Sequence, residues 1–142
     1  MFSVSHLHPM LVHFPIALII AGFALEVFHL IIKKEQCLSR AGFYLLILGT
    51  LGAIAAYLAG EFFTNDLAGA AGGIQEIHEL FASITLGTVI LTLLVRLYLM
   101  IKKKEETSLR WVYFTLYALS AIFVGITGFY GGTLVFSYMI GI

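Results

Sequence analysis

The segment HPMLVHFPIALIIAGFALEVFHLII, residues 8–32, decides the fold, because it starts with a histidine and continues as a mainly apolar stretch of membrane-spanning length. A helix needs about 20 such residues to cross the hydrocarbon core of a bilayer. Three further stretches of this length follow. The sequence therefore predicts one all-α domain over residues 1–142, an integral membrane four-helix bundle. The predicted spans are residues 10–32, 42–63, 77–101 and 111–130.

The composition agrees with a membrane protein. Of the 142 residues, 61% are hydrophobic and only 11% are charged, whereas soluble domains are roughly half apolar and about a quarter charged. The few basic residues are accounted for by membrane topology, so nucleic acid is excluded as a partner. No nucleophile elbow, phosphate loop or Ser/His/Asp arrangement is present. An enzyme acting alone is therefore disfavoured, and an electron-transfer subunit of an oxidoreductase stays open.

The basic residues predict the orientation in the membrane. All eight lie in or beside the loop after the first span and the loop after the third. Short loops rich in Lys and Arg stay in the cytoplasm. We therefore expect a bacterial inner-membrane protein with both termini on the periplasmic side. The basic residues are Lys33, Lys34, Arg40, Arg96, Lys102, Lys103, Lys104 and Arg110.

The sequence makes a separate structural prediction for each of three segments. Proline inside a helix lacks an N–H donor and clashes with the preceding turn, so Pro15 predicts a kink or break between Met10 and Pro15. The Gly/Ala-rich residues 64–73 are expected to form a mobile outward loop. Residues 131–142 either extend the last helix or fold over the periplasmic mouth as a lid, which would make Met139 a possible sulfur ligand.

Four of the five histidines gather at one predicted face of the membrane. His6, His8 and His13 precede the first span and His78 opens the third, so all four lie on the periplasmic side. His29 lies towards the cytoplasm by itself. An ionisable side chain in a membrane helix is costly unless it is paired, which makes the periplasmic group a candidate site.

Helix geometry aligns two of these histidines. Five turns of α-helix take about 18 residues, and this spacing separates both His8 from Glu26 and His78 from Arg96. We expect Glu26 and Arg96 to form an ion pair across the bundle, because each alone in hydrocarbon is costly. The same helix faces would then bring His8 opposite His78. A kink at Pro15 would instead allow His13 to replace His8.

Two facing imidazoles suit a six-coordinate haem iron, with His78 and either His8 or His13 as axial ligands. Cys37 is the only cysteine, so the motif for covalent haem attachment is absent and the haem would be of the b type. Small residues on the second and fourth helices either allow close helix packing or clear a flat surface for the cofactor. The candidate pocket residues are Phe14, Phe62, Phe81, Gly128 and Phe129.

Two other readings of the histidines remain open. Histidines at the membrane interface can simply be hydrated, with Glu79 bonded to His78, in a structural subunit that anchors a partner without any cofactor. Alternatively, His8, His13 and His78, with Glu79, form a site for a copper, zinc or iron ion, since imidazole suits all three metals.

Two motifs resemble a known family. The segments HPMLVHFPIALII (residues 8–20) and GFYGGTLVFSYMIGI (residues 128–142) resemble those of a bacterial four-helix membrane family catalogued as domain of unknown function 2231. The family's histidines correspond to His8, His13 and His78. The resemblance implies a four-helix domain, sometimes joined to c-type cytochrome domains, and hence periplasmic electron transfer. It supplies no established activity.

Together these features predict a small haem b protein for electron transfer, or a cytochrome subunit of a respiratory complex. A c-type cytochrome is the expected type of partner, and a quinol or a second copy of the chain is also compatible with the sequence.

Overall fold

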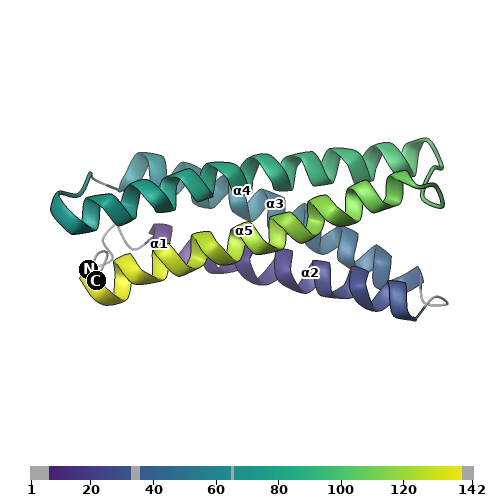
Figure 1. Cartoon of the computed structure of the whole chain (residues 1–142), viewed down its shortest axis with the longest axis horizontal. Helices are drawn as coiled ribbons and strands as arrows, with labels where there is room; N and C mark the ends of the chain where they lie inside the picture. The colour runs from purple at the N-terminus through teal and green to yellow at the C-terminus, as the bar shows by residue number, and fades with distance from the viewer. Residues whose placement is uncertain (1–6, 33–35, 65, 139–142) are drawn as a thin grey trace.

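A computed structural model describes residues 7–32, 36–64 and 66–138, and within these ranges the regular structure is helical throughout (Figure 1). Four segments are long and apolar enough to cross a membrane, so the predicted all-α membrane bundle is confirmed. The first of these segments consists of two helices that meet at Val12. The helices are α1 (Leu7–Leu11), α2 (His13–Ile31), α3 (Gln36–Phe63), α4 (Gly69–Ile101) and α5 (Leu109–Tyr138).

The first segment breaks where Pro15 predicts it. Val12 is a turn residue between α1 and α2, and the hydrogen bond from the Ile16 amide to the Val12 carbonyl is long, at 3.5 Å. Pro15 has no N–H to offer the carbonyl of Leu11. This missing bond is the physical reason for the break, which is slight, because Val12 keeps helical backbone angles (φ −63°, ψ −24°).

Two of the predicted helix ends lie elsewhere. The expected loop over residues 64–73 is shorter than predicted, because α4 already begins at Gly69. Gln75 stabilises this start by accepting a 2.9 Å hydrogen bond from the Leu67 amide. At the C-terminal end of the described chain, α5 continues to Tyr138, so residues 131–138 extend the helix. Met139 lies outside the described residues.

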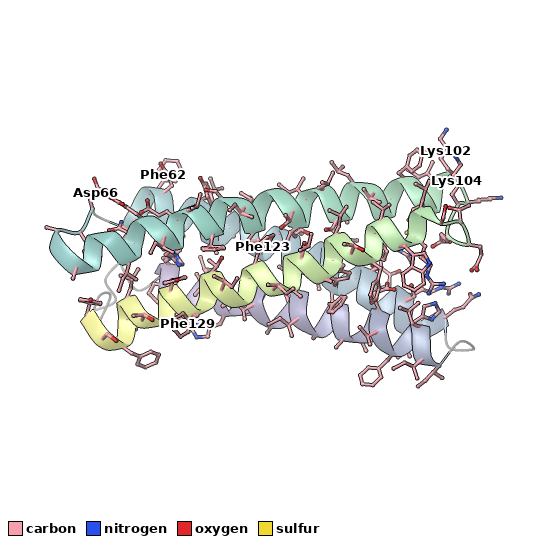
Figure 2. All side chains as sticks on the ribbon, viewed as in Figure 1. Phe62, Asp66, Lys102, Lys104, Phe123 and Phe129 are labelled. Carbon is pink, nitrogen blue, oxygen red and sulfur yellow. The ribbon has the colours of Figure 1, made fainter. Side chains whose placement is uncertain are left out.

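The two ends of the bundle differ in their ionisable residues. The histidine end holds α1, the start of α4 and the end of α5, and the lysine end holds the loop between α4 and α5 (Figure 1). Figure 2 shows Asp66 at the histidine end and Lys102 and Lys104 at the lysine end. Both histidines of the site described below belong to the first of these ends.

The bundle consists of two similar helical hairpins. Helix α2 packs along α3, and α4 packs along α5. Each buried residue of α2 has a buried counterpart 70 positions later on α4. Three buried residues of α3 likewise have buried counterparts 71 positions later on α5. The pairs are Pro15 and Thr85, Ile19 and Val89, Gly22 and Thr92, Glu26 and Arg96, Gly42 and Tyr113, Leu46 and Tyr117, and Gly49 and Ser120.

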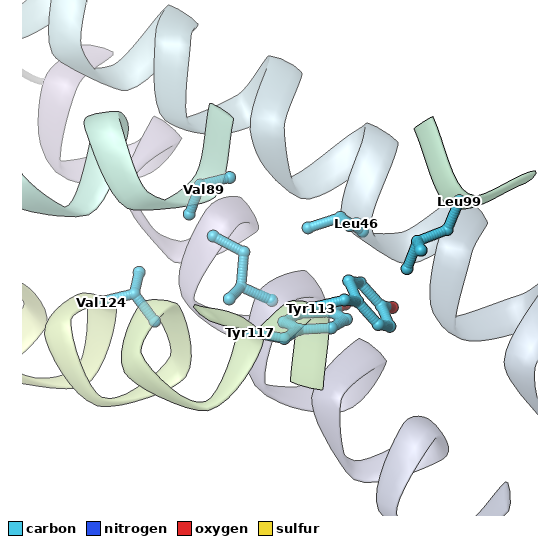
Figure 3. Packing of buried hydrophobic residues seen from close by; sticks show 7 residues of the cluster. Leu46, Val89, Leu99, Tyr113, Tyr117 and Val124 are labelled. Carbon is cyan, nitrogen blue, oxygen red and sulfur yellow. The ribbon is translucent and has the colours of Figure 1, made fainter. Parts of the chain in front are cut away.

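The middle of the bundle is filled by side chains from all four long helices, among them Ile19, Leu46, Val89 and Tyr117 (Figure 3). Lipid tails are as apolar as these side chains, so close packing and hydrogen bonds, rather than the hydrophobic effect, hold membrane helices together. Tyr117 does both, because its hydroxyl lies against Gly22 and donates a 3.2 Å hydrogen bond to the Gly42 carbonyl.

A buried polar network joins the helices at the lysine end. Glu26 accepts hydrogen bonds from Ser39 (3.1 Å) and Tyr113 (3.0 Å). Arg96 donates to Ser39 at 2.9 Å and lies 5.1 Å from the centre of the Tyr113 ring. Its ion pair is with Glu105, at 3.2 Å. Glu26 and Arg96 therefore belong to one network, but the predicted ion pair between them is not among the contacts of the described residues. Ser39 bridges the two side chains, and Glu105 from the loop forms the ion pair with Arg96.

We predict that Gly22→Ala destabilises the protein, because the added Cβ would lie 2.0 Å from the Tyr117 hydroxyl in a packed interior. Overpacking of this kind lowers the free energy of unfolding by about 1–3 kcal/mol. Gly87→Ala is the matched control, since its Cβ meets no atom within 4 Å and alanine favours a helix by about 1 kcal/mol. Thermal unfolding in detergent measures both, and equal stability of the two variants would contradict the packing described.

A second prediction concerns Glu105. Glu105→Gln removes the only ion pair that Arg96 makes among the described residues. The free energy of unfolding should fall by between about 1 kcal/mol, the value for an exposed pair, and about 3 kcal/mol, the value for a buried one. Glu106→Gln alters the adjacent exposed carboxylate and should leave the apparent Tm unchanged. A Glu105→Gln protein as stable as the Glu106→Gln protein would show that the ion pair contributes nothing.

Candidate histidine site

Two imidazoles face each other inside the histidine end. His8 comes from α1 and His78 from the third turn of α4. Their ring centroids are 6.0 Å apart and their planes cross at 86°. His78 is buried, with 9% of its surface exposed, and His8 is half-buried. Residues 70 positions apart in the chain thus meet between the two hairpins.

Both rings are held by hydrogen bonds to the backbone of another helix. The Nδ1 atom of His8 donates to the carbonyl of Ala56 on α3 (2.9 Å), and Nδ1 of His78 donates to the carbonyl of Thr127 on α5 (3.0 Å). A carbonyl only accepts, so each Nδ1 carries a proton. In the neutral ring this leaves the lone pair on Nε2. A bond of this type is what orients histidines that bind metals.

Each ring also lies against a glycine. A Cβ added to Gly60 would be 3.0 Å from Cε1 of His8, and one added to Gly131 would be 3.0 Å from Cε1 of His78. Real side chains rarely make contacts this close. Both glycines therefore clear space that an imidazole fills.

Two cavities meet at the imidazole pair, and His8, His78 and Gly131 line both of them. The deeper cavity, of about 190 Å³, reaches towards the middle of the bundle between mostly apolar residues such as Ala53, Leu86 and Val124. The outer cavity, of about 690 Å³, opens at the histidine end. Organic ligands and cofactors occupy pockets of about 300–1,000 Å³, so the space around the pair is of suitable size.

Among the described residues, carboxylates but no lysine or arginine line the outer cavity. Glu61, Asp66, Glu76 and Glu79 contribute to its wall. Glu79 accepts a 2.8 Å hydrogen bond from Gln75, whereas Nδ1 of His78 bonds to the Thr127 carbonyl. The mouth of the site therefore favours positively charged groups.

The pair supplies two metal ligands and no more. No group of three or more His, Cys, Asp or Glu side chains in the described ranges is arranged to hold a metal ion. A metal bound at about 2.0 Å from each of two imidazole nitrogens places the ring centroids roughly 6 Å apart. The observed separation of 6.0 Å is close to this value, and any further ligands would come from another source.

The other histidines are not part of the pair. His13 is exposed, and its Nδ1 donates to the Pro9 carbonyl at 2.7 Å, although it lines the rim of the deeper cavity. His8, rather than His13, therefore forms the pair with His78. His29 lies in the last turn of α2, far along the bundle. His6 is outside the described residues.

The phenylalanines that were predicted to line the pocket lie outside it. Phe14, Phe62 and Phe129 are exposed by 62%, 73% and 70%, and Figure 2 shows Phe62 at the outside of the bundle. Phe81 stacks on Tyr130 and lines neither cavity. The physical reason is helix phase, since a shift of one residue turns a side chain by about 100°. Gly128, next to Phe129, is the one predicted pocket residue besides the histidines that lines the cavity.

Sequence reasoning missed the backbone acceptors of the two rings. The signal was present as a small residue followed four positions later by glycine, Ala56 with Gly60 and Thr127 with Gly131. These two patterns lie 71 residues apart in the sequence, and the two histidines lie 70 residues apart. The same spacings separate equivalent positions of the two hairpins.

The comparisons with known proteins give a family and no activity. No curated protein and no solved structure matches the chain. A family model described as "Predicted membrane protein (DUF2231)" matches residues 5–142, a range that includes both imidazoles, their backbone acceptors and all four spans. The chain therefore belongs to the DUF2231 family of predicted membrane proteins.

Proposed function

We propose that this protein is a membrane electron-transfer cytochrome that holds one haem b between His8 and His78. The observation that carries the proposal is the pair itself, two rings from different hairpins at 6.0 Å, each with Nδ1 bonded to a carbonyl. Paired histidines with free Nε2 atoms are suitable axial ligands for haem iron.

The number of ligands favours haem over a bare ion. Structural zinc sites use four protein ligands and catalytic ones three, whereas the described residues bring together only two. Haem iron needs only axial ligands from the protein, because the porphyrin supplies the others. When bound, haem would supply a one-electron iron couple. The chain itself would ligate the iron, exclude water from the deeper cavity and set the local dielectric environment.

The charge distribution supports a periplasmic location for this site. The described basic residues, from Arg40 to Arg110, lie towards the lysine end, and the positive-inside rule assigns that end to the cytoplasm. The histidine end and both termini then face the periplasm of a bacterial inner membrane. A c-type cytochrome or a quinol is the class of redox partner that this location provides, and the chain would act as a subunit rather than as an enzyme alone.

The proposal predicts which histidines matter. In protein purified from haem-replete cells, His8→Ala and His78→Ala should each lower the haem content more than about tenfold, since even a change behind a ligand costs about that much. His13→Ala and His29→Ala are matched controls that should keep one haem per chain. Visible spectra, reduced minus oxidised, and a haem assay measure the outcome. A colourless unsubstituted protein, or full haem content in His78→Ala, would refute the proposal.

The acidic mouth favours a second candidate, a site for a copper, zinc or iron ion. Glu61, Asp66, Glu76 and Glu79 at the outer cavity attract cations and would concentrate them near the imidazoles. Metal analysis of the same purified sample separates the two functions, because bound metal without porphyrin absorbance selects this one. A sample with neither haem nor metal, and with unchanged partner assembly after replacement of His8, His13 and His78, would instead select a cofactor-free membrane anchor.

A further inference from the structure

The two histidines belong to two copies of the same local arrangement. In the first, His8 donates to the Ala56 carbonyl and packs on Gly60. In the second, His78 donates to the Thr127 carbonyl and packs on Gly131. The distances agree closely, at 2.9 and 3.0 Å for the hydrogen bonds and 3.0 Å for both contacts at the glycines.

Helix geometry explains why glycine comes four residues after the acceptor. A helical carbonyl points along the axis towards the amide of the residue four positions later. The side chain of that later residue therefore stands beside the carbonyl and screens it from a neighbouring helix. Gly60 and Gly131 have no side chain, so an imidazole can reach the carbonyls of Ala56 and Thr127 from the side.

We infer that His8–Ala56–Gly60 and His78–Thr127–Gly131 are two equivalent half-sites, and that Gly60 and Gly131 are positioning residues which set the planes of the two imidazoles. This inference deepens the proposed function, since a haem between the rings would meet the same surroundings on both faces. The equivalence agrees with the repeat of the hairpins, in which all four buried residues of α2 and three buried residues of α3 have buried counterparts 70 or 71 positions later.

The angle between the rings gives this inference a spectroscopic consequence. The planes cross at 86°, close to the largest possible angle. In oxidised low-spin haem, perpendicular axial imidazoles give a single low-field electron paramagnetic resonance feature at an unusually large g value, and more nearly parallel planes lower that value. A Cβ on either glycine would displace Cε1 by a few tenths of an ångström, rotate the ring and reduce the angle.

The first test needs no haem. Histidine ¹⁵N spectra of the full-length protein in micelles, assigned with single histidine replacements, should show both His8 and His78 as the Nδ1-protonated tautomer. Gly60→Ala should shift the His8 signals and leave those of His78 in place, and Gly131→Ala should do the reverse. Gly125→Ala and Gly132→Ala are controls, because a Cβ at these positions meets nothing within 4 Å.

The second test uses the haem-loaded protein. Gly60→Ala and Gly131→Ala should each lower the largest g value, in the same direction. Gly87→Ala and Gly125→Ala should keep the spectrum of the unsubstituted protein, because their Cβ meets nothing within 4 Å and neither residue lines a cavity. If the chain binds no haem, the proposed function fails, and the ¹⁵N spectra still decide the role of the glycines.

Several outcomes would overturn the inference. These are different tautomers for His8 and His78 in the unsubstituted protein, an effect of only one of the two glycines, or equal effects of Gly131→Ala and Gly132→Ala. The tautomers are read from the unsubstituted chain, so the test stays decisive even if a glycine variant does not fold.

Discussion

The bonds from the imidazoles of His8 and His78 to helix carbonyls are the interactions on which the histidine end depends. In a bilayer, a polar group without a partner costs several kcal/mol, and here each ring obtains its partner from the other helix of its own hairpin. The bond fixes the tautomer and the orientation of the ring, and the glycine beside each acceptor makes the approach possible.

At the opposite end, charged groups also find partners, except that the buried Nε of Arg96 has no hydrogen-bond partner among the described residues. Glu26 and Arg96 are both buried, and hydroxyl groups of Ser39 and Tyr113 satisfy the carboxylate while Glu105 balances the guanidinium. Between the two ends, hydroxyl pairs join α4 to α5 inside the second hairpin, Thr85 with Thr127 at 2.9 Å and Thr92 with Ser120 at 3.1 Å. Polar contacts thus position the helices at several depths, and apolar packing fills the space between them.

Much of this could be predicted from the sequence, because hydropathy and the spacing of ionisable residues are properties of single helices. The four spans, the break near Pro15 and the meeting of His8 with His78 follow from helix length and helix phase. The choice of His8 over His13 stayed open in the sequence, because it depends on how far the chain turns at Pro15, and Val12 keeps helical backbone angles. The prediction of the aromatic pocket residues was wrong because neighbouring residues of a helix point in different directions. Gly128 lines the cavity, whereas the adjacent Phe129 is exposed on the outside of the bundle. The partners of Arg96 were missed because Glu105 reaches it from a loop.

Two identical hairpins could not form this bundle without placing like charges at equivalent positions. Glu26 and Arg96 occupy equivalent positions, so a bundle built from two copies of the first hairpin would bring two carboxylates together in hydrocarbon, and one built from two copies of the second would bring two guanidinium groups together. Either assembly would suffer like-charge repulsion. Covalent fusion allows the halves to diverge into complementary partners at one end while both keep the same imidazole at the other.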